Sequence, residues 1–130
     1  MLKSEIIPAL KVALKEKGFK KVRNYWYKSQ HEMTFYLNVQ GSAYCSEDFY
    51  VNLGIVFSPF QGKIPQTYEW DIRRRVFVDN KEINLDIQDV LSIFCTFLNL
   101  FPTLTEAKAF AKNQKKQYQH IIISDRYQLI

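Results

Sequence analysis

The sequence is poor in the residues from which metal centres and disulfide frameworks are built. It has two cysteines, Cys45 and Cys95, and two histidines. No Cys-x-x-Cys pair, zinc-ligand spacing, phosphate-binding glycine loop or dinucleotide fingerprint is present. We therefore expect no cofactor, no metal site and no catalytic residue that a motif would assign. Both thiols are expected to stay reduced, as in the cytoplasm.

Long hydrophobic runs are absent too. The most apolar stretch, residues 87–101, contains Gln88, Asp89 and Asn99 and stops at Pro102. A bilayer span needs about 20 apolar residues, so this stretch predicts a buried helix instead. The chain also starts without the uninterrupted apolar segment of a signal peptide. These two absences predict a cytoplasmic protein with no membrane contact.

The apolar material that is present suffices for one core. Hydrophobic residues make up 47% and aromatic residues 15% of the chain, which excludes disorder as the main state. A length of 130 residues predicts a single domain over residues 1–130. The net charge of +5 allows an acidic partner without requiring one. Composition does not set the oligomeric state.

The N-terminal segment has helical periodicity. Apolar residues at helical spacing predict a helix over residues 4–17. Ser4 is expected as its N-cap and Gly18 as the residue that terminates it.

The last third of the chain has helical periodicity as well. A helix is predicted over residues 87–101 with Asp86 as its N-cap, and Thr103 and Glu106 have the spacing of a capping box that starts another helix. Residues 118–130 continue the helical stripe but include three β-branched isoleucines in a row, so helix and strand both stay open there.

Alternation of apolar and polar residues characterises the middle of the chain. It is clear over residues 33–40, 49–57 and 70–78, and residues 19–29 form a further run rich in Tyr and Trp. The short connections favour antiparallel pairing. The predicted fold class is therefore α+β, with an N-terminal helix, an antiparallel sheet of three to four strands, five at most, and C-terminal helices packed on one face of the sheet.

The last of these runs has one irregularity. Trp70 falls on its apolar side, and Arg74 interrupts that side. We expect Arg74 to lie at an edge of the sheet or to pair with a carboxylate such as Glu82 or Asp86.

Several of these segments together resemble a known family. The chain carries LKEKGFKK at residues 14–21, NYWY at 24–27, LNVQGS at 37–42 and FYVNLGI at 49–55, followed by three consecutive arginines. In this order and spacing they resemble the bacterial domain of unknown function DUF4304, over about residues 10–78. The resemblance implies a small bacterial α+β domain, and it brings no activity and no site residues with it.

One face of the predicted sheet is polar, and this face is the candidate site. If the apolar residues of each strand face the helices, alternation gathers amides, tyrosines and arginines on the opposite face. Tyr and Arg are enriched at binding hot spots, whereas the plain alternative is a solvated antiparallel face. The candidate binding residues are Tyr36, Asn38, Gln40, Tyr50, Asn52, Arg73 and Arg75, with Tyr25 and Tyr27 beside them.

Three classes of function are compatible with such a face. The first is a non-catalytic protein-binding module, such as an immunity or inhibitor protein, whose partner is another protein. The second is a single-stranded nucleic-acid-binding module, in which aromatic rings stack on bases. The third is an enzyme with a cleft near the Pro59–Pro65 loop, where a pair such as Cys45 and His31 would have to meet. The missing catalytic motifs favour the first class.

The same alternation predicts where the stability of the fold lies. Leu53, on the apolar side of a strand, and Phe94, on the most apolar helix, are expected to be buried. Tyr36 and Asn52, on the polar face, are expected to be solvated, so that truncating either costs less than about 1 kcal/mol. Gly54 lies within a strand and is expected to indicate a bulge or bend.

Overall fold

The computed structural model describes residues 3–41, 48–78, 86–113 and 121–123. Cys45 and Glu82 therefore lie outside the described residues. The elements, in chain order, are α1 (Lys3–Glu16), β1 (Lys20–Val22), β2 (Tyr25–Gln30), β3 (Met33–Gly41), β4 (Phe49–Val56), a 3₁₀ turn (Thr67–Glu69), β5 (Ile72–Val78), α2 (Ile87–Asn99), α3 (Leu104–Asn113) and β6 (Ile121–Ile123).

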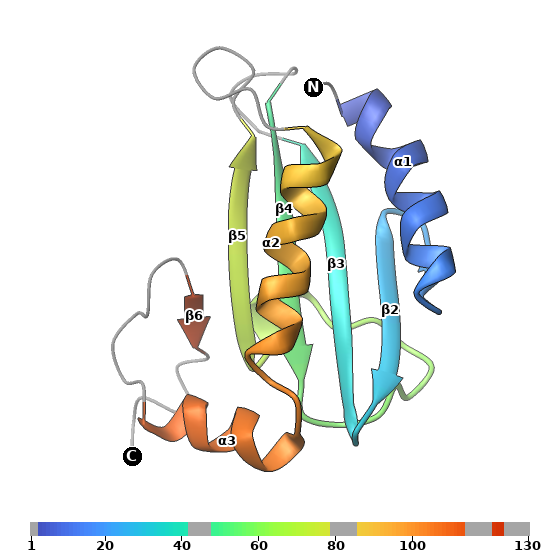
Figure 1. Ribbon diagram of the computed structural model, residues 1–130. Helices are drawn as coiled ribbons and strands as arrows, with labels where there is room; N and C mark the ends of the chain where they lie inside the picture. The colour runs from blue at the N-terminus through green and yellow to red at the C-terminus, as the bar shows by residue number, and fades with distance from the viewer. Residues whose placement is uncertain (1–2, 42–47, 79–85, 114–120, 124–130) are drawn as a thin grey trace.

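The described strands form one antiparallel sheet in the order β1-β2-β3-β4-β5-β6, so each strand pairs with its neighbours in sequence. Figure 1 shows α1 and α2 on one side of the sheet, with α2 in front of β3 and β4. The predicted α+β class is confirmed. The sheet has more strands than expected, because residues 19–29 contain two strands and because the C-terminal segment adds β6.

Tight turns connect β1 to β2 and β2 to β3. Arg23, with φ 57°, lies in the connection between β1 and β2, and His31 and Glu32, with φ 54° and 65°, connect β2 to β3. At His31 and Glu32, positive φ at both central residues is the type I′ arrangement, whose twist suits antiparallel strands. The second turn lies between the two predicted runs 19–29 and 33–40. The first was missed because Arg23 and Asn24 are only two polar residues inside the run of residues 19–29.

A Schellman motif ends α1. The Gly18 N–H donates to the Lys15 carbonyl at 3.0 Å, the Phe19 N–H donates to the Leu14 carbonyl at 2.9 Å, and Gly18 has φ 86°. Gly18 is therefore confirmed as the terminating residue. The helix starts at Lys3, so Ser4 lies inside its first turn and the prediction of Ser4 as the N-cap is wrong.

The C-terminal helices begin at side-chain caps. Asp86 and Asp89 form a full capping box at α2, in which each carboxylate accepts the backbone N–H of the other residue. At α3, Thr103 Oγ1 accepts the Glu106 N–H at 3.1 Å. Beyond α3, residues 121–123 are a strand, which decides the open choice between helix and strand for that part of the segment.

The main core lies between the sheet and the helices. Leu53 and Phe94 are both fully buried in it, as predicted, and the Phe94 ring meets Phe19 edge-on with centroids 5.4 Å apart. Within the described residues no single helix has the length and apolar character of a membrane span. Only the pair α2 and α3, taken together, has this length and apolar character, and the two helices are bent by 93° at the break between them.

Arg74 lies on the helix-facing side of β5, opposite Leu53. Its Nε is buried without a hydrogen-bond partner. The prediction of an edge position is wrong, because β6 pairs with β5 over residues 72–74. Asp86, one of the carboxylates expected to pair with Arg74, caps α2 instead.

Candidate functional site

The strand registers define the face of the sheet that points away from α1 and α2, which we call the outer face. Rows of paired residues run across it from strand to strand, and they place all seven candidate binding residues on this one face. The first row is Tyr27, Tyr36, Gly54 and Arg73, the second is Tyr25, Asn38, Asn52 and Arg75, and the third is Gln40, Tyr50 and Phe77.

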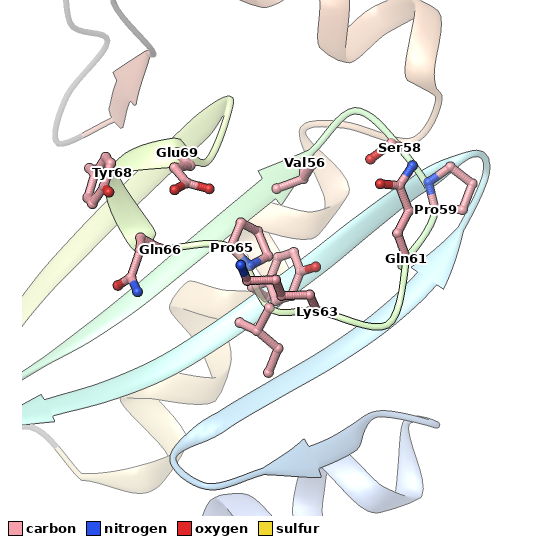
Figure 2. Close-up of a pocket in the computed structure, with 11 residues that line it drawn as sticks. Val56, Ser58, Pro59, Gln61, Lys63, Pro65, Gln66, Tyr68 and Glu69 are labelled. Carbon is pink, nitrogen blue, oxygen red and sulfur yellow. The ribbon is translucent and has the colours of Figure 1, made fainter.

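The connection between β4 and β5 covers part of the outer face. Residues 57–71 form a compact loop whose ends meet, as in an Ω-loop. The Phe57 N–H donates to Asp71 Oδ2 at 2.7 Å, and the Asp71 N–H donates to the Ile55 carbonyl at 2.9 Å. Figure 2 shows Ser58 and Gln66 on opposite arms of this loop. We refer to residues 57–71 as the Ω-loop.

Two aromatic side chains of the Ω-loop pack on the first row. Phe60 stacks on Tyr27 with ring centroids 4.1 Å apart, and Trp70 stacks on Tyr36 at 5.4 Å with 13° between the ring planes. The Trp70 ring also fills the space that a Cβ on Gly54 would take. The prediction that Trp70 faces the helices is therefore wrong. Gly54 makes room for a ring, and the register through it is unbroken, so it creates no bulge.

The outer face is consequently not the solvated surface that the sequence predicts. Tyr36 is 2% exposed, Asn38 is 6% exposed and Asn52 is fully buried. These three candidate residues are inaccessible to a partner in this conformation. Truncating Tyr36 or Asn52 is therefore expected to cost more stability than the sequence predicts, because both side chains are buried.

Asn52 is the centre of a hydrogen-bond network in the second row. Its Nδ2 donates to Asn38 Oδ1 at 3.0 Å and to Gln40 Oε1 at 3.1 Å, and its Oδ1 accepts from Arg75 Nε at 3.0 Å. Asn38 Nδ2 donates in turn to the Asn24 carbonyl at 3.2 Å. A buried amide network whose members are paired favours one arrangement of its side chains, so the network positions Arg75.

Arg75 has two further contacts. Its Nη2 donates to Gln40 Oε1 at 3.3 Å, and its guanidinium carbon lies 4.5 Å from the centre of the Tyr50 ring, a cation–π geometry. Tyr50 packs against Phe77 with ring centroids 5.0 Å apart. The amide and ring partners of Arg75 are all neutral, so they orient its positive charge without cancelling it.

Arg73 lies two residues away on the same strand and the same face. It is half-buried, and burial, followed by the positive charge of Arg75, lowers the pKa of Arg73 from its usual value. Within the described part of the chain it makes no hydrogen bond and no ion pair. The outer face thus holds two neighbouring guanidinium groups, one of them partly desolvated.

One accessible part of the outer face lies on β3, β4 and β5, and Lys20, Val22 and Tyr25 form another on β1 and β2. We consider the part on β3, β4 and β5. Its residues, which we call the arginine patch, are Gln40, Tyr50, Arg73, Arg75 and Phe77. Gln40 and Phe77 are exposed, Phe77 by 43%, and the other three are half-buried. Phe77 was not among the candidate residues, although the alternation that selected Arg73 and Arg75 places it on the same face.

Open hollows border the Ω-loop. One of about 650 Å³ lies between its arms and includes Lys63, Tyr68 and Glu69 (Figure 2). Its lining contributes one carboxylate, that of Glu69, and neither histidine nor cysteine. His31 lies in the exposed β2–β3 turn. In the described ranges no three His, Cys, Asp or Glu side chains gather as they would around a metal ion.

Burial of Tyr36 has a consequence for stability at high pH. Desolvation raises the pKa of Tyr36 to about 12 from an ordinary value of 10.0. The folded state holds the phenol proton of Tyr36 more tightly than the unfolded state does. The stability that depends on the neutral Tyr36 side chain is therefore fully present below pH 10 and is lost as the pH rises toward 12. We expect Tyr36→Phe to lose less stability than the unmodified protein between pH 9 and about 11.5, measured by urea unfolding. A Tyr68→Phe control, changed at an exposed ring, should follow the unmodified protein, and equal losses in all three would contradict the assignment.

The fold and this face define a two-layer α+β protein in which one sheet face is covered by helices and the other, in part, by an Ω-loop. The chain matches the family described as Domain of unknown function (DUF4304) over residues 10–93, which is more than half of its length, and it belongs to that family. The match includes β1 to β5 and therefore every residue of the arginine patch. Comparisons with curated proteins and with solved structures gave no match.

Proposed function

We propose that the chain is a protein-binding module that contacts its partner through the arginine patch. The observation that supports the proposal best is the support of Arg75 by Asn52, Gln40 and Tyr50. A side chain held in place before binding loses little conformational entropy when a partner arrives. Two arginines beside two aromatic rings also have the composition of interface hot spots. Inhibition of a partner enzyme, or immunity against a toxin, is one form that such binding would take.

Binding to single-stranded nucleic acid has less support. That mode needs several aromatic faces open for stacking on successive bases. On the outer face, Phe60 covers Tyr27 and Trp70 covers Tyr36. Phe77 is the exposed ring beside the arginines on β5, and Tyr25, a half-buried ring of the same face, lies three strands away on β2. Two rings so placed do not form a row of platforms for successive bases.

The aromatic half of the patch provides the test. The purified protein, a Tyr50→Ala/Phe77→Ala variant and a control Val12→Ala variant are each immobilised and offered the same cell extract. Val12 is an exposed apolar residue on α1, in the other layer of the molecule. We expect a protein that the unmodified chain and the control retain in equal amounts and that the double variant retains at about a tenth of that level or less.

Thermal unfolding of the double variant is measured in parallel, and the single variant Phe77→Ser, changed at an exposed ring, repeats the comparison with less risk to the fold. The proposal fails if folded patch variants retain the same proteins as the unmodified chain, or if no protein distinguishes the three baits.

A further inference from the structure

We propose that the arginine patch recognises an acidic segment of the partner protein, with carboxylate groups bound by Arg73 and Arg75. This inference rests on the proposed protein-binding function and adds the chemistry of the partner. It starts from the charge on the outer face. On the described strands β1 to β5, the outward positions of this face include the cations Lys20, Arg73 and Arg75 and no aspartate or glutamate. Two carboxylates continue the same alternation just before the strands. Asp48 precedes β4, and Asp71 precedes β5, where it is 2% exposed and accepts the Phe57 N–H.

The two guanidinium groups repel each other, and neither forms an ion pair with another described residue. Residues two apart on a strand are separated by roughly 7 Å, and the charge of Arg75 contributes to the lowered pKa of Arg73. An anion placed between them removes the repulsion and pairs with the partly desolvated Arg73. Charge-assisted hydrogen bonds of this kind are roughly twice as strong as neutral ones.

Arg75 has hydrogen-bond donors available for such an anion. Its Nε and Nη2 donate to Asn52 and Gln40, which leaves the other guanidinium N–H groups for a ligand. The planar fork of a guanidinium matches the two oxygens of a carboxylate. Because Asn52 is fully buried, the orientation of that fork is set by the interior of the protein and not by the ligand.

The surroundings favour an acidic peptide over a nucleic acid. Tyr50 and Phe77 form an apolar surface directly beside Arg75, which suits an aliphatic or aromatic residue next to an acidic one. A nucleic acid strand needs a stripe of cations along its phosphates, whereas the cations of this patch are two neighbours on one strand. The expected ligand is therefore a short segment that combines Asp or Glu with an apolar residue.

The test uses defined peptides with the intact protein. Hexaglutamate, hexaglutamine and a twelve-nucleotide oligothymidine are titrated by NMR at about 20 mM and about 150 mM salt, since screening weakens exposed charge pairs. We expect hexaglutamate to bind at least about tenfold more tightly than hexaglutamine. It should shift the side-chain N–H signals of Arg73 and Arg75. Arg75→Lys, which keeps the charge and loses the fork, should weaken binding by about fivefold or more.

The matched variants are Arg73→Gln/Arg75→Gln and a Lys3→Gln/Lys11→Gln control, which removes the same charge from α1. Loss of hexaglutamate binding in the first and its retention in the second supports the inference. Equal weakening in both, or oligothymidine binding more tightly than hexaglutamate through the same arginines, overturns it. If a captured partner depends on Tyr50 and Phe77 but not on the arginines, the protein-binding function stands and the acidic chemistry fails.

Discussion

Gly54→Ala is expected to destabilise the protein by about 3 kcal/mol, at the upper end of the usual cost of overpacking. A Cβ at this position would overlap the six-membered ring of Trp70. The ring would have to leave its place on Tyr36, and with it the Ω-loop would lose one of its two aromatic contacts with the outer face. Urea unfolding measures the cost. Near-ultraviolet circular dichroism reports the displacement of the ring.

A double-mutant cycle identifies the cause. If the overlap with Trp70 is responsible, Gly54→Ala should cost nothing in a Trp70→Ala background, where alanine even suits a strand better than glycine. Gly41→Ala is the matched control, because the nearest atom to its added Cβ is the flexible end of Lys3. An equal cost in both backgrounds would mean that Gly54 is needed for its backbone and not for the ring.

Phe94→Ala should cost about 3–5 kcal/mol through lost burial and the cavity that remains. Phe94 is fully buried on α2 and meets Phe19, the residue at which the Schellman motif joins α1 to β1. Its removal therefore loosens both helices from the sheet. Against a typical net stability of 5–15 kcal/mol, such a loss lowers the thermal midpoint by several degrees per kcal/mol.

Leu53→Ala tests the sheet side of the same core and should cost about 2–5 kcal/mol. Val12→Ala is the control, since Val12 is 63% exposed on α1, and it should stay within about 0.5 kcal/mol of the unmodified protein. Phe94→Ala and Val12→Ala with equal midpoints would show that α2 is not held against the sheet.

Local sequence patterns predict those helices and strands whose pattern comes from their own residues. Alternation over residues 33–40 and 49–57 predicts β3 and β4 with the correct residues on each face, because side chains on a strand point to opposite sides in turn. Gly18 and Asp86 are predicted as helix ends because the caps depend on residues within a few positions.

The candidate site was predicted in part for the same reason. Alternation places Gln40, Tyr50, Arg73 and Arg75 on one face, and they do lie together in the arginine patch. Alternation does not indicate which side chains of a face are covered by another segment. Tyr36, Asn38 and Asn52 were included with the others, although they are buried.

Covering of the outer face depends on residues far apart in the chain. The Ω-loop has neither helical nor strand periodicity, so its path over the first row is set by Phe60 meeting Tyr27 and by Trp70 meeting Tyr36. Such long-range contacts leave no regular signal in the chain. The sequence predicts a bulge or bend at Gly54, whereas its role depends on a ring from another segment that lies over it.

Periodicity and neighbouring residues are enough to predict the α+β class, the antiparallel strands, several helix ends and the faces on which polar and apolar side chains lie. The division of the polar face into covered and accessible parts follows only from the three-dimensional packing, because the burial of a side chain depends on which distant segment packs on it. Pairing of β3, β4 and β5 brings together the network around Asn52 and places Arg73 and Arg75 two residues apart on one face.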